Sequence, residues 1–331
     1  MKKKLFIGID ISKDTFDYVG IDDCANIILS NGVCINDMEP IRGFISTIKK
    51  YQKEYDVWVC LEHTGYYGLS LATSLANASI TFSLLNPIEV KRSSTLVRVK
   101  NDKVDAKKIA NYGLMNRHNL KPTQLPVKEL QQLKAWHGMR AMYVKTLVQH
   151  KNYLRSLQVA SKSIDGLELI DFHKATIKEI ERQIKDIEKK MQELINSNAE
   201  LSTTYKKITS VVGVGPVVAA ACIIATENFT KFTKARKFAC HCGVAPFENS
   251  SGTSIHRKAK TSKICDNKLK SILSQAACTA VQHDIQLKNY YRRKLNEGKS
   301  KSGTLNAVAN KIILRIFAVA FRDQPYIKIA A

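Results

Sequence analysis

The sequence lacks several patterns that mark common protein classes. No uninterrupted apolar run reaches the roughly 18 residues of a membrane-spanning helix, so no membrane partner is expected. No G-x-G-x-x-G motif lies within a βαβ pattern, which argues against a dinucleotide-binding fold. No C-x-x-C pair and no His pair at zinc spacing accompanies Cys240 and Cys242, so no zinc is expected. Asp10 and Lys13 interrupt the first apolar run, which makes it a poor signal peptide and predicts a cytoplasmic or nucleoid-associated protein.

Acidic residues are scarce beside basic ones. The chain has 52 Lys and Arg against 29 Asp and Glu, a formal net charge of +23. Residues 201–331 alone carry 22 basic and 6 acidic residues. So positive a field favours a polyanionic partner, most simply nucleic acid, although a merely basic soluble protein is the alternative. Hydrophobic residues make up 44%, as in globular proteins, and the apolar contexts of Cys60, Cys222 and Cys278 predict buried, reduced thiols.

The first 120 residues alternate short strand and helix patterns. Residues 4–20 predict two antiparallel strands around a turn near residues 12–14. The segments that follow predict in turn a strand, a helix, a strand, a helix and a strand, at residues 26–35, 38–52, 56–62, 65–79 and 80–87. The order βββαβαβ predicts an α/β domain over residues 1–120.

The rest of the chain reads as mainly helical. Two prolines in residues 121–129 predict a hinge, and residues 127–160 and 170–198 predict long helices. Apolar residues recur at helical spacing in the second helix, at Ile177, Ile180, Ile184, Ile187, Met191 and Leu194. This pattern predicts a coiled-coil-like hairpin or a dimerisation arm over residues 121–202, or a helical bundle internal to one chain. Residues 203–331 predict helices at 267–283 and 304–321, joined by a basic loop at 290–303 that is either a nucleic-acid contact or an ordinary solvated loop.

A glycine-rich turn, Gly213-Val214-Gly215-Pro216, lies between apolar flanks. It resembles a helix–hairpin–helix turn, in which backbone amides at a helix start meet a DNA phosphate. Close packing of helices would also account for Gly213 and Gly215.

Carboxylates recur at positions that can converge. Asp10 interrupts the centre of the apolar first strand, and Glu62 ends the strand at 56–62, where open α/β sheets place their sites. Asp102 and Asp105 are three residues apart, so a helix turns them to one side. Taken singly, each acid is an ordinary surface or capping residue. Together they can hold two Mg²⁺ or Mn²⁺ ions for phosphodiester cleavage, which favours a ribonuclease H-like nuclease site.

Several motifs resemble those of the insertion sequence 110 family of transposases, which are related to the Piv DNA invertases. The motifs near the start are "IGIDISKDTFD", "CLEHTGYYG" and "VKNDKVDAKKIA". The later ones are "ITSVVGVGPVVAAACIIATE", "FACHCGVAPFENSSGTSI" and "KLKSILSQAA". The resemblance implies a RuvC-like DEDD catalytic domain at 1–120, a helical coiled-coil linker at 121–202 and a mainly α transposase domain at 203–331. It places the family's four acids on Asp10, Glu62, Asp102 and Asp105.

The resemblance also implies a mechanism and partners. The family's essential serine falls on Ser251, with Ser250 as the rival, and attacks a DNA phosphate to give a phosphoserine link. Family members pair a structured non-coding bridge RNA with donor and target DNA, which delegates sequence reading to base pairing. A prokaryotic homodimer or homotetramer is expected. The predicted nucleic-acid contacts are Lys91, Arg92, Arg98, Lys100, Lys103, Lys107, Lys108, Gly213, Gly215, Arg257, Lys258, Lys260, Arg292 and Arg293.

Two other functions use the same residues. A Holliday-junction or ribonuclease H-type hydrolase would use the acids with water as the nucleophile, without strand joining. A non-catalytic nucleic-acid-binding protein would keep the acids for structural reasons only.

Overall fold

The computed structural model describes residues 2–63, 65–93, 102–162, 167–251, 255–322 and 324–327. Within these ranges the side chains of residues 102, 103, 167, 248–251 and 255–259 are not described. The chain divides into two compact units, Met1–Leu125 and Pro126–Ala331. The predicted limit near residue 202 therefore separates two parts of one compact unit, and each unit is described below by itself.

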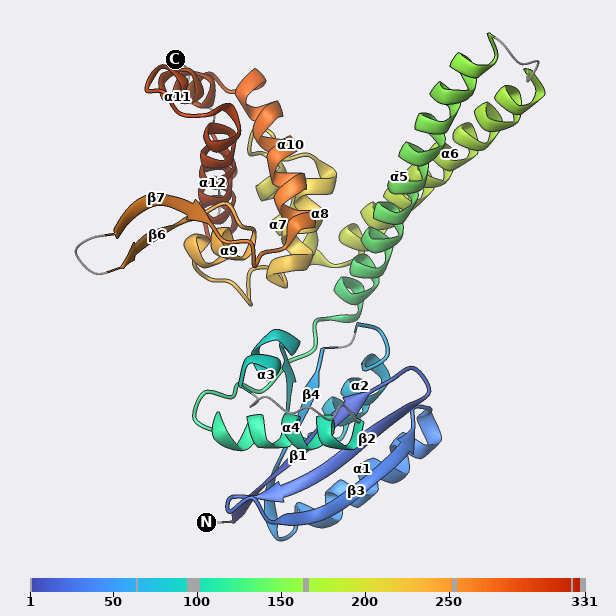
Figure 1. Cartoon of the computed structure of the whole chain (residues 1–331), viewed down its shortest axis with the longest axis vertical. Coiled ribbons are helices and arrows are strands. Elements are labelled where there is room, and N and C mark those ends of the chain that lie inside the picture. The colour runs from blue at the N-terminus through green and yellow to red at the C-terminus, as the bar shows by residue number, and fades with distance from the viewer. Residues whose placement is uncertain are drawn as a thin grey trace. The chain divides into compact units, whose positions relative to one another are not determined.

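Unit 1 is built on one mixed five-stranded sheet (Figure 1). Its elements in chain order are β1 (Lys3–Ile11), β2 (Thr15–Asp22), β3 (Ile27–Ile35), α1 (Met38–Tyr51), β4 (Tyr55–Glu62), α2 (Leu69–Asn77), β5 (Phe82–Leu85), α3 (Pro87–Ser93) and α4 (Asp102–Met115). The strand order is β3-β2-β1-β4-β5; β1 to β3 are antiparallel, and β4 and β5 run parallel to β1. The predicted βββαβαβ order is confirmed.

The sheet buries both faces because its central strands are apolar at almost every position. Leu5, Ile7 and Ile9 of β1 pack with α1 and α2 on one face. Phe6 lies on the opposite face, where Ala106 and Ala110 of α4 cover β1 and β2 (Figure 1). Successive residues of a strand face opposite sides, so every second residue of β1 points toward α4.

The close approach of α4 to the sheet depends on Gly8. A Cβ atom at Gly8 would overlap the backbone oxygen of Ala106 and the backbone nitrogen of Ala110. Both neighbours are backbone atoms of a packed helix, so they cannot turn aside as a flexible side chain can. Gly8 thus sets the distance between the sheet and the helix that carries Asp102 and Asp105.

We expect Gly8→Ala to destabilise unit 1 by about 3 kcal/mol, because the added methyl group forces α4 off the sheet. Urea denaturation of a Trp136→Phe background, which leaves Trp58 as the fluorescent reporter in unit 1, measures the change. Gly43→Ala in α1 is the matched control, since a Cβ there meets nothing within 4 Å and alanine favours helix. Equal stabilities of the two variants would contradict this packing.

The segment after α4 extends the sheet edge. Trp58 Nε1 donates to Ser83 Oγ (2.9 Å), which donates to the carbonyl of Lys121 (2.7 Å). The Thr123 amide donates to the carbonyl of Phe82 in β5 (2.7 Å). The first half of the predicted hinge at 121–129 is therefore bonded to the sheet, and the division between the units falls after Leu125.

Unit 2 begins with two long helices, α5 (Lys128–Ala160) and α6 (Leu167–Ser197), that pack along each other (Figure 1). Ile180, Ile187 and Met191 of α6 are buried, as their spacing predicts. Ion pairs join the helices, from Arg140 to Glu188 (2.7 Å) and from Lys151 to Glu181 (2.6 Å). The two helices therefore bury an apolar stripe against each other within one chain.

The remainder of unit 2 packs around one apolar core. Its elements are α7 (Ala199–Thr209), α8 (Pro216–Thr226), α9 (Ala235–His241), β6 (Pro246–Ser251), β7 (Ile255–Thr261), α10 (Asn267–His283), α11 (Ile285–Asn296) and α12 (Lys301–Ala320). By length and composition α12 could cross a membrane, but Ile312, Ile316 and Phe317 are buried in this core, as in the central helix of a packed domain.

Two expectations for unit 2 are wrong. The predicted basic loop at 290–303 is helical at both ends, because Asp284 caps α11 through the Leu287 amide (2.9 Å) and Leu287 is buried. Cys278 is exposed, because Ala276, Ala277 and Ala280 face the core and a residue at 278 turns away from it on the helix.

Candidate active site

Asp10 and Glu62 lie side by side at one edge of the sheet. β1 and β4 are parallel, and Ile9 pairs with Leu61 in the register, so Asp10 and Glu62 are the next neighbours. Asp10 is the second-to-last residue of β1 and is half-buried, so its predicted place at the strand centre is wrong. The strand ends at Ile11 because Ser12 and Thr15 form the turn predicted near residues 12–14, with the Ser12 amide donating to the Thr15 carbonyl (2.9 Å). Both acids therefore stand at carboxyl ends of parallel strands.

The same two acids face α4. Gly8 contacts α4, and Asp10 is two residues further on the same face of β1. Cys60 packs with Ile109 of α4, and Glu62 follows two residues later in β4. The first turn of α4 carries Asp105, directly before Ala106, which is buried against the sheet. Three of the four predicted acids thus lie on one side of the sheet, while the side chain of Asp102, the first residue of α4, lies outside the described residues.

The charges of these acids act on each other. Burial, followed by the negative charges of Asp10 and Asp105, raises the pKa of the Glu62 carboxyl above its ordinary value. Lys108, one turn along α4, donates to Asp105 Oδ1 (2.7 Å). Carboxylates that repel each other at a half-buried strand end fit hard divalent cations, which bind oxygen ligands and would offset this repulsion. No group of three or more His, Cys, Asp or Glu side chains is close enough to hold a metal ion among the described side chains, which do not include Asp102.

Asp17 is an acid of this region that the sequence analysis does not single out. It pairs directly with Asp10 across β1 and β2, and its neighbours on the same face, Val19 and Ile21, pack against α4. Like charges on directly opposed strand residues are destabilising, so this pair is costly unless the surroundings offset it. The alternating pattern of "TFDYVGID" could have identified Asp17 from the sequence, because it places Asp17 on the face of the strand opposite to Phe16.

The predicted serine lies in the β6–β7 hairpin of unit 2. Ser250 pairs with His256 and Ser251 with Ile255 in the antiparallel register. Both serines are strand residues at the end of β6. The side chains of Ser250 and Ser251 lie outside the described residues, and the two units are described separately, so the geometry between the serine and the acids is not described.

The glycine turn at Gly213 is explained by packing. Gly213 has φ +90°, and a Cβ there would lie 2.6 Å from the Ala276 oxygen of α10. Gly215 is the N-cap of α8 and has nothing within 4 Å of a Cβ position. Close packing therefore accounts for Gly213 but not for Gly215.

The predicted cations fall in several places. Arg92 and Lys107 are exposed on α3 and α4, and Arg292 is exposed on α11. Arg293 is exposed, lies 3.7 Å from Glu297 and stands over the ring of Tyr290 (5.6 Å). Lys91 belongs to α3 and Lys260 is exposed on β7. Residues that lie outside the described part of the chain, or whose side chains do, are Arg98, Lys100, Lys103, Arg257 and Lys258.

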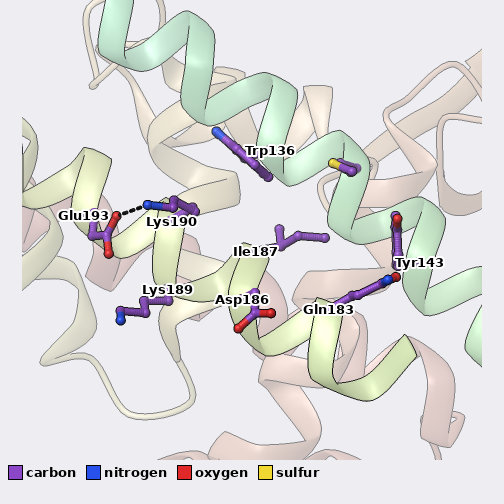
Figure 2. Close-up of a pocket in the computed structure, with 9 residues that line it drawn as sticks. Trp136, Tyr143, Gln183, Asp186, Ile187, Lys189, Lys190 and Glu193 are labelled. Carbon is purple, nitrogen blue, oxygen red and sulfur yellow. Dashed lines mark hydrogen bonds and ion pairs between the residues drawn. The ribbon is translucent and has the colours of Figure 1, made fainter. Parts of the chain in front are cut away.

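Unit 2 also has a groove between α5 and α6, with a volume of about 450 Å³ (Figure 2). Apolar side chains such as Trp136 and Ile187 line it, and Asp186, Lys190 and Glu193 add charges of both signs to the lining. None of the predicted site residues is among the residues that line this groove.

Two family models and several curated relatives match this chain. Residues 7–160 match a protein family described as a transposase, the DEDD domain of IS110, and residues 205–292 match the transposase IS116/IS110/IS902 family. The chain is 24% identical to the pilin gene-inverting protein of Moraxella bovis over 98% of both chains. It is 23% identical to the transposase for insertion sequence element IS1111A of Coxiella burnetii, over 98% of this chain and 92% of that one. A solved structure of T. thermophilus RuvC in complex with a Holliday junction substrate covers 36% of this chain and 99% of its own, at 12% identity and a TM-score of 0.29.

Together these observations define a transposase, with an α/β domain that bears acids at the ends of parallel strands followed by a second transposase domain. Such proteins are enzymes that act on DNA strands. The chain belongs to the IS110 family of transposases.

Proposed function

We propose that this protein cuts and rejoins DNA strands of a mobile element with a metal-dependent DEDD site and a serine nucleophile. The observation that carries the proposal is the gathering of Asp10, Glu62 and Asp105 on one face of the sheet, in a chain with both transposase domains. Asp10, Glu62, Asp102 and Asp105 would hold Mg²⁺ or Mn²⁺ ions, two of which when bound would stabilise charge on the attacking and leaving oxygens.

The proposed nucleophile is Ser251, with Ser250 as the alternative. Its Oγ loses a proton and attacks the phosphorus, the bond from phosphorus to the 3′ oxygen breaks, and that oxygen takes a proton. A 3′ hydroxyl then attacks the phosphoserine, which restores the phosphodiester and releases the serine. A free serine is a weak nucleophile that needs a base, a metal ion or a lowered pKa to activate it.

The proposed partners are donor DNA, target DNA and a structured non-coding guide RNA. A net charge of +23 fits several polyanionic chains, and base pairing would supply the sequence reading. The proposed phosphate contacts are the exposed cations Arg92, Lys107, Lys260, Arg292 and Arg293. The long helices α5 and α6 are proposed to form a coiled coil in a homodimer or homotetramer. We place the protein in the cytoplasm of a prokaryotic cell, at the nucleoid.

One experiment tests the reaction and the guide together. The protein is purified from cells that carry its mobile element with both flanks, the bound nucleic acid is sequenced, and the complex is assayed on labelled DNA. We expect one discrete RNA and rejoined DNA products with Mg²⁺, and neither cleavage nor joining with EDTA. Rejoined DNA products without a discrete bound RNA would contradict the proposal that an RNA guides the protein. Cleavage without joining, in the presence of the RNA, would favour a RuvC or ribonuclease H-type hydrolase.

A further inference from the structure

Lys108 is a basic residue of α4 that lies beside the acidic site. Its Nζ lies 2.7 Å from Asp105 Oδ1, and the two side chains are only 25% and 28% exposed. Solvent screens a pair with this degree of burial less than it screens a fully exposed pair. The adjacent Lys107 is exposed, and no ion pair joins it to another side chain in the part of the chain that the structure describes. Of these two neighbouring lysines, only Lys108 is positioned by an acid of the site.

Asp105, the partner of Lys108, is one of the acids whose negative charges repel each other in the site. The negative charges of Asp10 and Asp105 both disfavour an ionised Glu62. The ammonium group of Lys108 offsets the charge at the Asp105 end of this group. A divalent cation at Asp105 would do the same, and it would repel the ammonium at contact distance. The ammonium group of Lys108 and a divalent cation would therefore compete for the negative charge of Asp105.

We propose that Lys108 is a built-in counter-ion of Asp105, which holds this carboxylate before a divalent cation binds, and that cation binding releases its ammonium group toward a DNA phosphate. The inference rests on the proposed function, because it assigns Asp105 to the metal site. The flexible four-carbon stem of lysine allows the head group to move while the backbone of α4 stays in place. Lys108 then acts as a positioning residue for Asp105 in one state and as a phosphate contact in the other.

Mn²⁺ binding to the full-length protein tests the first half of the proposal. The protein is freed of nucleic acid and titrated with Mn²⁺, and the free ion is followed by electron paramagnetic resonance. We expect Lys108→Met to bind Mn²⁺ about fivefold more tightly than wild type, because the competing ion pair is gone. Lys107→Met removes the same charge without touching an acid, so it should change the affinity by less than about twofold. Lys108→Arg keeps the cation and should bind Mn²⁺ as wild type does.

DNA binding in Ca²⁺, which allows complex formation to be measured apart from cleavage, tests the second half. With the metal present, Lys108→Met should lower the salt dependence of DNA binding by about one phosphate contact relative to wild type. Without metal, the two proteins should show the same salt dependence, because Lys108 is then occupied by Asp105.

Each contrary result has a distinct meaning. Equal Mn²⁺ affinities of Lys108→Met and Lys107→Met, or weaker binding by Lys108→Met, would overturn the counter-ion role while the metal site stands. No Mn²⁺ binding by wild type and by Lys108→Met alike would contradict the proposed metal site and the counter-ion role with it. Thermal denaturation in EDTA shows whether Lys108→Met keeps the fold; if it does not, Lys108→Arg against Lys108→Gln decides the same comparison.

Discussion

Replacing Asp10 with asparagine is expected to lower metal-dependent DNA strand cleavage by on the order of 10³-fold, as when one group that stabilises transition-state charge is lost. The substitution keeps the size of the side chain and removes one negative charge beside Glu62. An amide binds a hard divalent cation less strongly than a carboxylate does. Cleavage of labelled DNA by the purified complex in Mg²⁺ gives the rate, and Mn²⁺ titration gives the affinity.

The same substitution should leave the metal-free fold intact. Asparagine keeps the size of the side chain and removes a like charge beside Glu62, and the midpoint of thermal denaturation in EDTA measures whether the metal-free fold is kept. Asp14→Asn is the matched control, because Asp14 lies just beyond β1 with a side chain 82% exposed, 3.9 Å from Lys13. A normal cleavage rate for Asp10→Asn would favour a structural role for the acids and a non-catalytic nucleic-acid-binding protein.

Replacing Ser251 with alanine is expected to abolish the covalent protein–DNA adduct and all strand joining. The proposed phosphoserine link cannot form without the hydroxyl group, and the energy of the broken phosphodiester is then not conserved for rejoining. A denaturing gel of labelled DNA, run before and after protease treatment, detects the adduct. Ser251 pairs with Ile255 at the end of β6, and a strand accommodates alanine at this position. The substitution should therefore keep the hairpin.

Ser250→Ala is the matched control for this prediction. It changes the preceding residue of the same strand, opposite His256, and should keep adduct and joining if Ser251 is the nucleophile. Loss of the adduct in Ser250→Ala alone would move the assignment to Ser250. Persistent cleavage by Ser251→Ala, with no adduct in wild type, would show that water is the nucleophile and that the enzyme is a hydrolase.

Local patterns were sufficient to predict the five strands and the first two helices of unit 1, but not α3. The strands β1, β2 and β4 and the helix α1 follow from short-range periodicity and turn residues, and all occur as predicted. The pattern failed at residues 290–303, where a high density of basic residues resembled a loop. There the cap at Asp284 and the burial of Leu287 favour a helix, and these depend on packing against the rest of unit 2.

The candidate site, like the fold, could be predicted from the sequence only in part. The residue types and the three-residue spacing of Asp102 and Asp105 were enough to nominate the acids, because carboxylates at such positions are local features. Sequence reasoning placed Asp10 at a strand centre, although the turn that it predicted near residues 12–14 ends β1 one residue after Asp10. It also treated Lys108 only as a phosphate contact, although the helix directs it to Asp105.

The sequence by itself determined that this protein has an α/β domain with candidate catalytic acids, a helical middle and a strongly basic second half, because composition and periodicity are properties of short segments. Only the tertiary structure decided which acids become neighbours. Asp10 meets Glu62 through the parallel register of β1 and β4, and Asp105 joins them because Gly8 lets α4 lie against the sheet. Register and helix approach are set by contacts between residues far apart in the chain, which no local pattern contains.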